Sequence, residues 1–186
     1  CVGQSATFTV AASGTITSYQ WRKGGVNIPG ANAASYTIAA VATTDAGSYD
    51  VVITGPCGTA TSNAATLTVN TLPSITDQPD NDTKCVGQSA TFSVVTSGTV
   101  TSYQWRKNGT NITGANAASY TIASVATTSA GNYDVVITGP CGTVTSNAAS
   151  LTVNTTPAIN SQPANATACV GQSATFTVAA SGTITS

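Results

Sequence analysis

The chain has 186 residues, a formal net charge of −1 and only 6% charged residues, with no histidine and no methionine. Its six acids are all aspartates, which leaves little for general acid–base catalysis, and we expect no enzyme activity and no cofactor. Five basic residues are too few to form a track for nucleic acid. No run of about 18 apolar residues occurs, so no membrane span is expected in this stretch.

The sequence repeats itself with a period of 84 residues. The motif of residues 1–8 returns at 85–92 and at 169–176, and 65 of 84 positions agree between residues 1–84 and 85–168. Such a period is typical of a tandem array of domains. Because the chain starts inside one copy and stops inside another, we expect it to be a piece of a longer array.

Within each copy, apolar residues alternate with polar ones. The alternation runs through Ala6–Val10, Tyr19–Trp21 and Tyr36–Ile38, and glycine-rich or proline-rich turns separate these stretches. Alternation predicts half-buried strands, and the spacing of the turns fits about seven short strands per copy. The predicted fold class is all-β, with one sandwich per copy.

These residues resemble the immunoglobulin-like superfamily. The segment Gly3–Val10, followed by Trp21, resembles strands B and C with their buried tryptophan, and Tyr49 falls at the tyrosine-corner position. The resemblance implies tandem immunoglobulin-like β-sandwiches arranged end to end. It implies a core in each copy whose members are Val10, Trp21, Tyr49 and Val51, repeated as Val94, Trp105, Tyr133 and Val135.

The cysteines depart from the family pattern. Where the superfamily usually places its inter-sheet cysteine pair, this chain has Val10 and Val51. Cys1 precedes the strand that resembles B, and Cys57 follows the one that resembles F. Cys85 and Cys141 keep the same separation of 56 residues. With both positions taken to lie toward one end of the sandwich, we predict disulfides Cys1–Cys57 and Cys85–Cys141, of the kind found in exported proteins.

Three domains are predicted from the repeat. Residues 1–70 form a first domain that lacks its first strand, residues 71–154 a complete second domain, and residues 155–186 the first strands of a third. The stretch Pro73–Pro79 is predicted to be the opening strand of the second domain, bent by its prolines. Almost no free linker remains, which favours end-to-end stacking as a semi-rigid rod.

Two charged clusters suggest sites. Asp77, Asp80 and Asp82 have the oxygen chemistry that Ca²⁺ prefers, but the next junction has Ser161, Ala164 and Ala166 instead. We therefore predict a solvated turn and no metal site. Arg22 and Lys23 suggest a ligand patch, and solubilising surface charges are the favoured interpretation.

Near-identical, weakly charged copies resemble the tandem arrays of large bacterial surface adhesins and extracellular fibres. The resemblance implies a structural repeat of an extracellular filament, fibre or adhesin stalk that supplies length and mechanical stability. Two alternatives stay open: an adhesin-type module that binds a glycan or protein, and an accessory domain of a larger secreted enzyme. The expected location is extracellular or at the cell surface. The expected partners are copies of itself, in a continuous array or a laterally associated or strand-exchanged filament.

Overall fold

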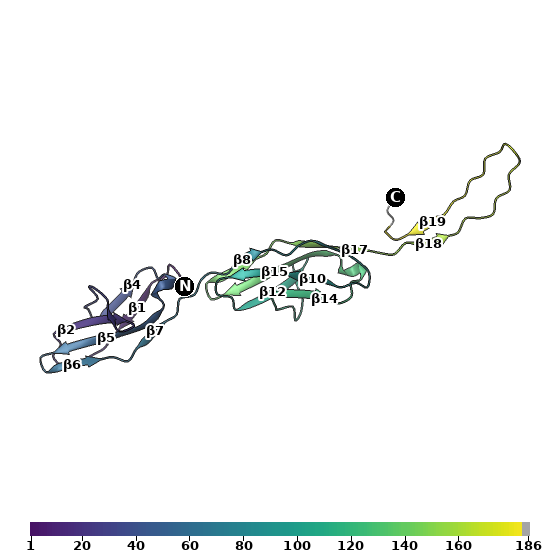
Figure 1. Ribbon diagram of the computed structural model, residues 1–186. Coiled ribbons are helices and arrows are strands. Elements are labelled where there is room, and N and C mark those ends of the chain that lie inside the picture. Colours follow the sequence, from purple (N-terminus) through teal and green to yellow (C-terminus); the bar gives the residue numbers. More distant parts are fainter. Residues whose placement is uncertain (184–186) are drawn as a thin grey trace. The chain divides into compact units, whose positions relative to one another are not determined.

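A computed structural model describes residues 1–183, so the last three residues of the predicted third domain, 184–186, lie outside it. The regular elements of the described chain are strands, apart from two short 3₁₀ helices, η1 (Thr43–Asp45) and η2 (Thr127–Ser129) (Figure 1). None of its helices is long and apolar enough to cross a membrane.

Residues 1–70 form seven strands. They are β1 (Ala6–Thr9), β2 (Ser18–Lys23), β3 (Val26–Asn27), β4 (Ser35–Ile38), β5 (Gly47–Gly55), β6 (Gly58–Thr61) and β7 (Ala65–Leu67). One sheet has the order β3-β2-β5-β6, with β7 also on β5, and β1 pairs with β4 in a second sheet. The register places Phe8 opposite Tyr36 and Trp21 opposite Val51. The all-β sandwich expected from the alternation is confirmed.

Residues 71–154 repeat this pattern and add strands before it. The strands are β8 (Ser74–Asp77), β9 (Asp82–Cys85), β10 (Ala90–Ser93), β11 (Val95–Ser97), β12 (Ser102–Lys107), β13 (Thr110–Asn111), β14 (Ser119–Ile122), β15 (Gly131–Gly139), β16 (Gly142–Thr145) and β17 (Ala149–Asn154). Strand β8 pairs with β11, and β9 runs parallel to β17 at the edge of the larger sheet. The segment 74–85 thus adds β8 beside β11 and β9 beside β17.

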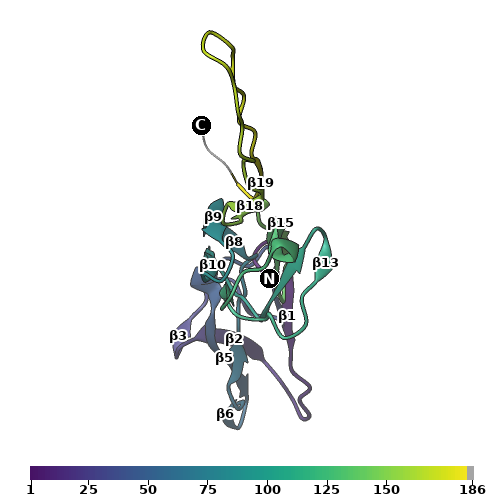
Figure 2. The ribbon, with the colours of Figure 1, turned by 90° about the vertical axis from the view of Figure 1, so that its right-hand side faces the viewer.

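Residues 155–183 form only a hairpin of β18 (Ala158–Ser161) and β19 (Ala179–Ser181), shown in Figure 2. All of its strand residues are exposed, including Ile159 at 58%. Phe176, whose counterpart Phe92 is buried, is 66% exposed. This hairpin has no core of its own.

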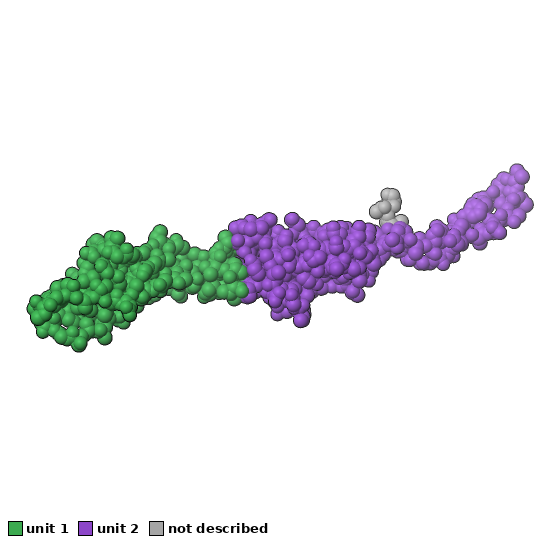
Figure 3. All heavy atoms as spheres, turned by 60° about the horizontal axis from the view of Figure 1, so that its bottom comes forward, with its two compact units in different colours: residues 1–74, 97–101, 138–143 green, residues 75–96, 102–137, 144–186 purple. Residues whose placement is uncertain are grey.

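The chain divides into two compact units (Figure 3). Unit 1 comprises residues 1–74, 97–101 and 138–143, and unit 2 comprises the remainder. Unit 1 thus takes in two turns that belong, by sequence, to the second copy of the repeat. The boundaries predicted at 70/71 and 154/155 follow the repeat and remain a prediction.

The core of each copy is aromatic. Phe92 stacks on Tyr133 at 4.7 Å between ring centroids, and Phe8 stacks on Tyr49 at 4.6 Å. Of the residues predicted for the core, Trp21, Tyr49, Val51, Val94, Trp105, Tyr133 and Val135 are buried. Val10 is half-buried and packs against the cluster of Trp21 and Val51.

Equivalent residues are covered to different extents in the two copies. Ala90 and Ala149 are 1% and 0% exposed, whereas their counterparts Ala6 and Ala65 are half-buried and exposed. The first copy has an open groove of about 120 Å³ over this region, lined by residues that include Phe8, Trp21 and Ala65. The predicted second domain, residues 71–154, carries β8 and β9 in addition. Its opening segment, 71–84, accounts for the closed core around Ala90 and Ala149.

Candidate functional site

Two of the cysteines lie at the tips of hairpins. Gly55 at the end of β5 pairs with Gly58 at the start of β6, so that Pro56 and Cys57 form the two-residue turn between them. Cys141 occupies the same place after β15, between Gly139 and Gly142. A hairpin tip projects its side chains beyond the sheet, and Cys57 is exposed.

Two other cysteines begin the turn before the first strand of each copy. The turn that starts at Cys1 is held by the Gln4 N–H, which donates to the Cys1 carbonyl oxygen at 3.1 Å, and by the Gly3 N–H, which donates to Val41 at 2.8 Å. Val41 lies shortly before η1 and the start of β5. Cys85 repeats the arrangement, since Gly87 donates to Val125 at 2.8 Å.

The two cysteines of one copy therefore lie at opposite ends of it. Cys1 is near the beginning of β5 and Cys57 follows its end, and the nine residues of β5 span about 26 Å at about 3.3 Å per residue. A disulfide needs Cα atoms within roughly 4.4–6.8 Å of each other. The predicted pairs Cys1–Cys57 and Cys85–Cys141 are therefore wrong, because the turns they occupy are not at the same end.

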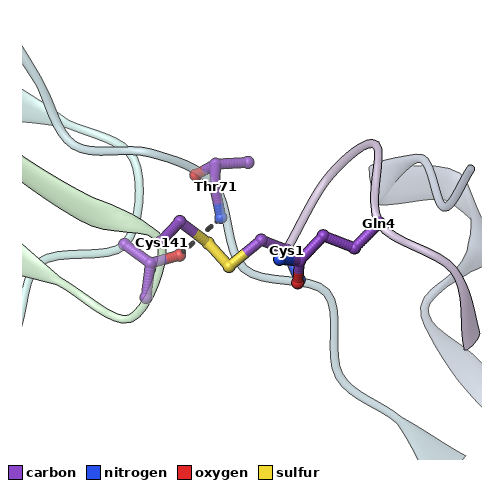
Figure 4. The surroundings of a disulfide bond; sticks show 5 residues. Cys1, Gln4, Thr71 and Cys141 are labelled. Atoms are coloured by element: carbon purple, nitrogen blue, oxygen red, sulfur yellow. Dashed lines mark hydrogen bonds between the residues drawn. A yellow bond between two sulfur atoms is a disulfide. The ribbon is translucent and has the colours of Figure 1, made fainter.

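The structure instead joins the first copy of the repeat to the second through Cys1 and Cys141 (Figure 4). Their Cα atoms are 5.6 Å apart, within the range of an ordinary disulfide, and 140 residues separate them in sequence. Both residues belong to unit 1. In the chain-entropy model, closing a loop of this length stabilises the folded state by about 5 kcal/mol.

The connecting residues Thr71, Leu72 and Pro73 sit beside this bond. The Thr71 N–H donates to Thr99 Oγ1 at 3.1 Å, and the Thr99 N–H donates back to the Thr71 carbonyl oxygen at 3.3 Å. Pro73 is fully buried. The connection between the copies is thus a docked segment held by hydrogen bonds and burial, and the disulfide reinforces it.

Glycine is required where the connecting segment docks. A Cβ atom on Gly98, whose φ is +84°, would lie 2.3 Å from the Leu72 carbonyl oxygen. One on Gly139 would lie 2.1 Å from the Thr99 carbonyl oxygen and 2.7 Å from Pro73 Cγ. No side chain fits in this space, so both glycines are needed for the close approach of the connecting backbone.

The remaining cysteines, Cys57, Cys85 and Cys169, are free thiols, and all three are exposed. Beside Cys57 is a hollow of about 410 Å³, lined by residues that include Ser13, Gly14, Thr15 and Gly55. These four positions are the counterparts of Ser97, Gly98, Thr99 and Gly139, three of which contact the connecting segment in the second copy. The hollow is therefore lined by the same residue types that surround the connecting segment in the second copy.

The basic residues considered as a ligand patch are engaged within each copy. Arg22 Nε and Nη2 donate to the two carboxylate oxygens of Asp50 at 2.8 and 2.9 Å, and Arg106 binds Asp134 in the same way at 2.8 and 2.6 Å. Lys23 donates to the Thr44 carbonyl oxygen and lies 5.8 Å above the ring of Tyr49. These contacts favour a structural role for the basic pair.

The tyrosine at the corner position makes the expected local bond in both copies. Tyr49 donates its hydroxyl to the Asp45 carbonyl oxygen, and Tyr133 donates to that of Ser129, each at 2.7 Å. Burial raises the pKa of both phenols, and the charge of Asp45 raises that of Tyr49 further. Each hydroxyl thus ties the turn before β5 or β15 to the sheet.

The aspartates considered for calcium are not brought together. Asp82 accepts a hydrogen bond from the Thr83 N–H at 2.8 Å and lies 3.3 Å from the Lys84 ammonium group. Across residues 1–183, no three acidic, cysteine or histidine side chains gather as metal ligands.

Two known proteins are similar to this chain in sequence. No protein-family model matches the chain. It is 33% identical over 173 residues to the muscle M-line assembly protein unc-89 of Caenorhabditis elegans, which covers 81% of this chain and 2% of that protein. It is 32% identical over 120 residues to endoglucanase C of Cellulomonas fimi, which covers 61% of this chain and 11% of that protein. The chain therefore spans a small part of either relative.

Solved structures agree on the fold. An I-band fragment of titin, I67–I69, matches with a TM-score of 0.68 at 20% identity, over 87% of this chain and 64% of the fragment. The four N-terminal Ig domains of Dscam1 isoform 6.9 match with a TM-score of 0.59 at 21% identity, over 82% of this chain and 42% of theirs. The chain has the fold of tandem immunoglobulin-like domains.

Proposed function

We propose that this tandem of immunoglobulin-like domains is a tension-bearing segment of an extracellular filament, fibre or stalk. The observation that carries the proposal is the disulfide Cys1–Cys141, which ties one copy of the repeat to the next. A covalent bond between copies resists separation under load in a way that a docked linker alone does not. Disulfides persist in oxidising compartments, which supports an extracellular or cell-surface location.

The distribution of aromatic residues favours a structural role over recognition. Binding surfaces concentrate exposed aromatic side chains, whereas Phe92, Trp105 and Tyr133 are buried in the core. Among the described residues, Phe176 is the exposed aromatic side chain, and it belongs to the hairpin without a core. Within the described residues 85–168, no aromatic side chain is exposed.

The disulfide also determines how far the chain can extend. A pull between the two ends of the oxidised chain passes from Cys1 directly to Cys141, so that residues 2–140 between them carry no extension. At about 3.5 Å per extended residue, the disulfide shortens the fully extended chain by about 490 Å. The first domain, which lies wholly inside the loop, is thereby protected from unravelling.

Single-molecule force spectroscopy tests the proposal. The chain is held by handles at its two ends and stretched before and after reduction. We expect the fully extended chain to be about 490 Å longer after reduction, and we expect unfolding events of the first domain to appear only then. A Cys1→Ser variant serves as the control and should behave like the reduced chain in both conditions. Equal contour lengths in the two conditions would contradict the proposal.

A further inference from the structure

We propose that Asn111 is an N-glycosylation site, whose sugar chain projects from the outermost strand of the second domain. The acceptor sequence is Asn111-Ile112-Thr113, which begins at the end of β13. The inference rests on the extracellular location in the proposed function, because N-linked sugars are carried by exported proteins.

The hairpin of β12 and β13 differs from its counterpart in the first copy at three positions. Strand β12 has the same sequence as β2, so the differences are confined to the turn and the edge strand. Asn108, Thr110 and Thr113 stand where the first copy has Gly24, Val26 and Pro29. The first copy therefore has no acceptor sequence here, whereas the second has two that overlap, beginning at Asn108 and at Asn111.

Other asparagines that begin an acceptor sequence are less suited to modification. They are Asn81, Asn108, Asn154 and Asn165. Asn81 Oδ1 accepts a hydrogen bond from the Ser150 N–H at 2.7 Å, Asn154 is half-buried, and Asn165 lies between the two strands of the hairpin that has no core. Asn111 is exposed, and its side chain makes no hydrogen bond within residues 1–183.

The amide of Asn108 is fixed against β15. Its Oδ1 accepts the Asn132 N–H at 2.9 Å, and its own backbone N–H donates to the Asn132 carbonyl oxygen at 2.8 Å. A Cβ atom on Gly131 would lie 2.9 Å from Asn108 Oδ1 and 3.0 Å from Nδ2. A sugar on Asn108 Nδ2 would displace this packing. Of the two overlapping acceptor sequences, the one that begins at Asn111 is compatible with the folded hairpin.

The sheet directs the Asn111 side chain away from the core. Asn111 lies directly opposite Arg106, and residues that face each other across two strands point to the same side of the sheet. Arg106 binds Asp134 on the side opposite to its buried neighbour Trp105. Because β13 is the last strand of this sheet, a sugar on Asn111 has no neighbouring strand beside it.

A sugar at this place protects the edge of the sheet. The edge strand of the first copy, β3, is followed closely by Pro29, and proline hinders the pairing of an edge with another chain because it has no N–H to donate. The second copy has lost this proline in favour of Thr113. The same replacement makes Asn111 an acceptor, so a bulky, hydrated sugar takes the place of proline as protection of the edge.

The transfer uses a lipid-pyrophosphate-linked oligosaccharide as donor. Asn111 Nδ2 attacks C1 of the first sugar, and a bond forms between the nitrogen and this carbon. The bond between C1 and the pyrophosphate oxygen breaks, and the lipid pyrophosphate leaves with the electron pair. The nitrogen gives up one proton to a base of the transferase, so that the product is a neutral N-linked glycan.

The test secretes the full chain from a eukaryotic cell, which supplies the transferase and its donor. Peptide-N-glycosidase then converts each glycosylated asparagine to aspartate, and mass spectrometry of the tryptic peptides locates the converted position. We expect conversion at Asn111 in peptide 108–186. Thr113→Pro, which introduces the residue of the first copy, should abolish it, and Pro29→Thr should add a second sugar at Asn27, the exposed counterpart of Asn111.

Asn108→Gly is the matched control, since it introduces the first-copy residue at the turn and should leave the sugar on Asn111. A secreted chain with no sugar on Asn111, a sugar on Asn108 in its place, or a sugar on Asn111 that persists in Thr113→Pro would overturn the inference. If such a chain still has the Cys1–Cys141 disulfide, the proposed function survives that failure.

Discussion

Arg22 and Asp50 face each other directly across β2 and β5, the two central strands of the first copy, and their side chains share two hydrogen bonds. Both side chains are half-buried, with 26% and 19% exposure. Such a planar, two-bonded arrangement fixes orientation as well as charge. Because Arg106 and Asp134 repeat it, the pair marks the register of the central strands in each copy.

Replacing Asp50 with asparagine should destabilise the first domain. The substitution keeps the shape of the side chain but leaves the guanidinium of Arg22 without its charged partner. Urea unfolding followed by circular dichroism should show a lower transition midpoint for Asp50→Asn. Asp80→Asn, at an exposed aspartate, is the matched control and should leave the midpoint where it is. Equal midpoints for all three proteins would show that the ion pair contributes nothing.

The same pair predicts a dependence on acid. The two hydrogen bonds from Arg22, together with its charge, lower the pKa of Asp50 below its ordinary value. A carboxyl with a lowered pKa contributes stability above its ordinary pKa, near 4, and this contribution is lost as the pH falls through the lowered value. The difference in unfolding free energy between the wild type and Asp50→Asn should therefore be constant near neutral pH and shrink below about pH 4. A difference that grew in acid would contradict this assignment.

Replacing Trp105 with alanine should cost about 3–5 kcal/mol of stability, as removal of a large buried aromatic side chain does. The side chain is fully buried, and its indole N–H donates to the Ala117 carbonyl oxygen at 3.0 Å. Trp21→Ala is the matched variant and should cost less, because the groove of the first copy already opens onto Trp21. Chemical unfolding followed by circular dichroism measures both, and a loss below about 1 kcal/mol for Trp105→Ala would refute its place in the core.

Replacing Tyr133 with phenylalanine should cost about 1 kcal/mol, the contribution of one hydrogen bond. Tyr120→Phe, at a half-buried tyrosine of the same copy, is the control and should cost less. Burial, followed by the proximity of Tyr120, raises the pKa of Tyr133. An absorbance titration should accordingly lose a late-ionising phenol in Tyr133→Phe. A titration curve that loses an early-ionising phenol would contradict the burial.

The strands and the role of the corner tyrosine could be predicted from the sequence because both depend on local patterns. Alternation determines which residues face the core, and Tyr49 bonds to a residue only four positions away. The disulfide depends instead on the direction in which each strand runs. The equal spacing of 56 residues cannot distinguish pairing within a copy from pairing between copies, since 140 is the same 56 plus one period of 84. The hydrogen bond from Gly3 to Val41, which places Cys1 at the far end from Cys57, has no signal in the sequence.

Local sequence patterns also could not predict that equivalent residues of the two copies are buried to different extents. Ala6 and Ala90 lie in near-identical sequences, and their exposure differs because the segment 71–84 packs with the strands that surround Ala90. The hollow beside Cys57 was not predictable from the sequence either. It depends on the side-by-side placement of the turns at residues 13–15 and 55–58.

Non-reducing tryptic mapping of the oxidised monomer tests the central claim most directly, because cleavage after the five basic residues places Cys1, Cys57 and Cys85 on separate peptides. The account predicts peptide 1–22 linked to peptide 108–186, the same link in Cys169→Ser, and free thiols on peptides 24–84 and 85–106. Peptide 1–22 linked to 24–84, with 85–106 linked to 108–186, would contradict it.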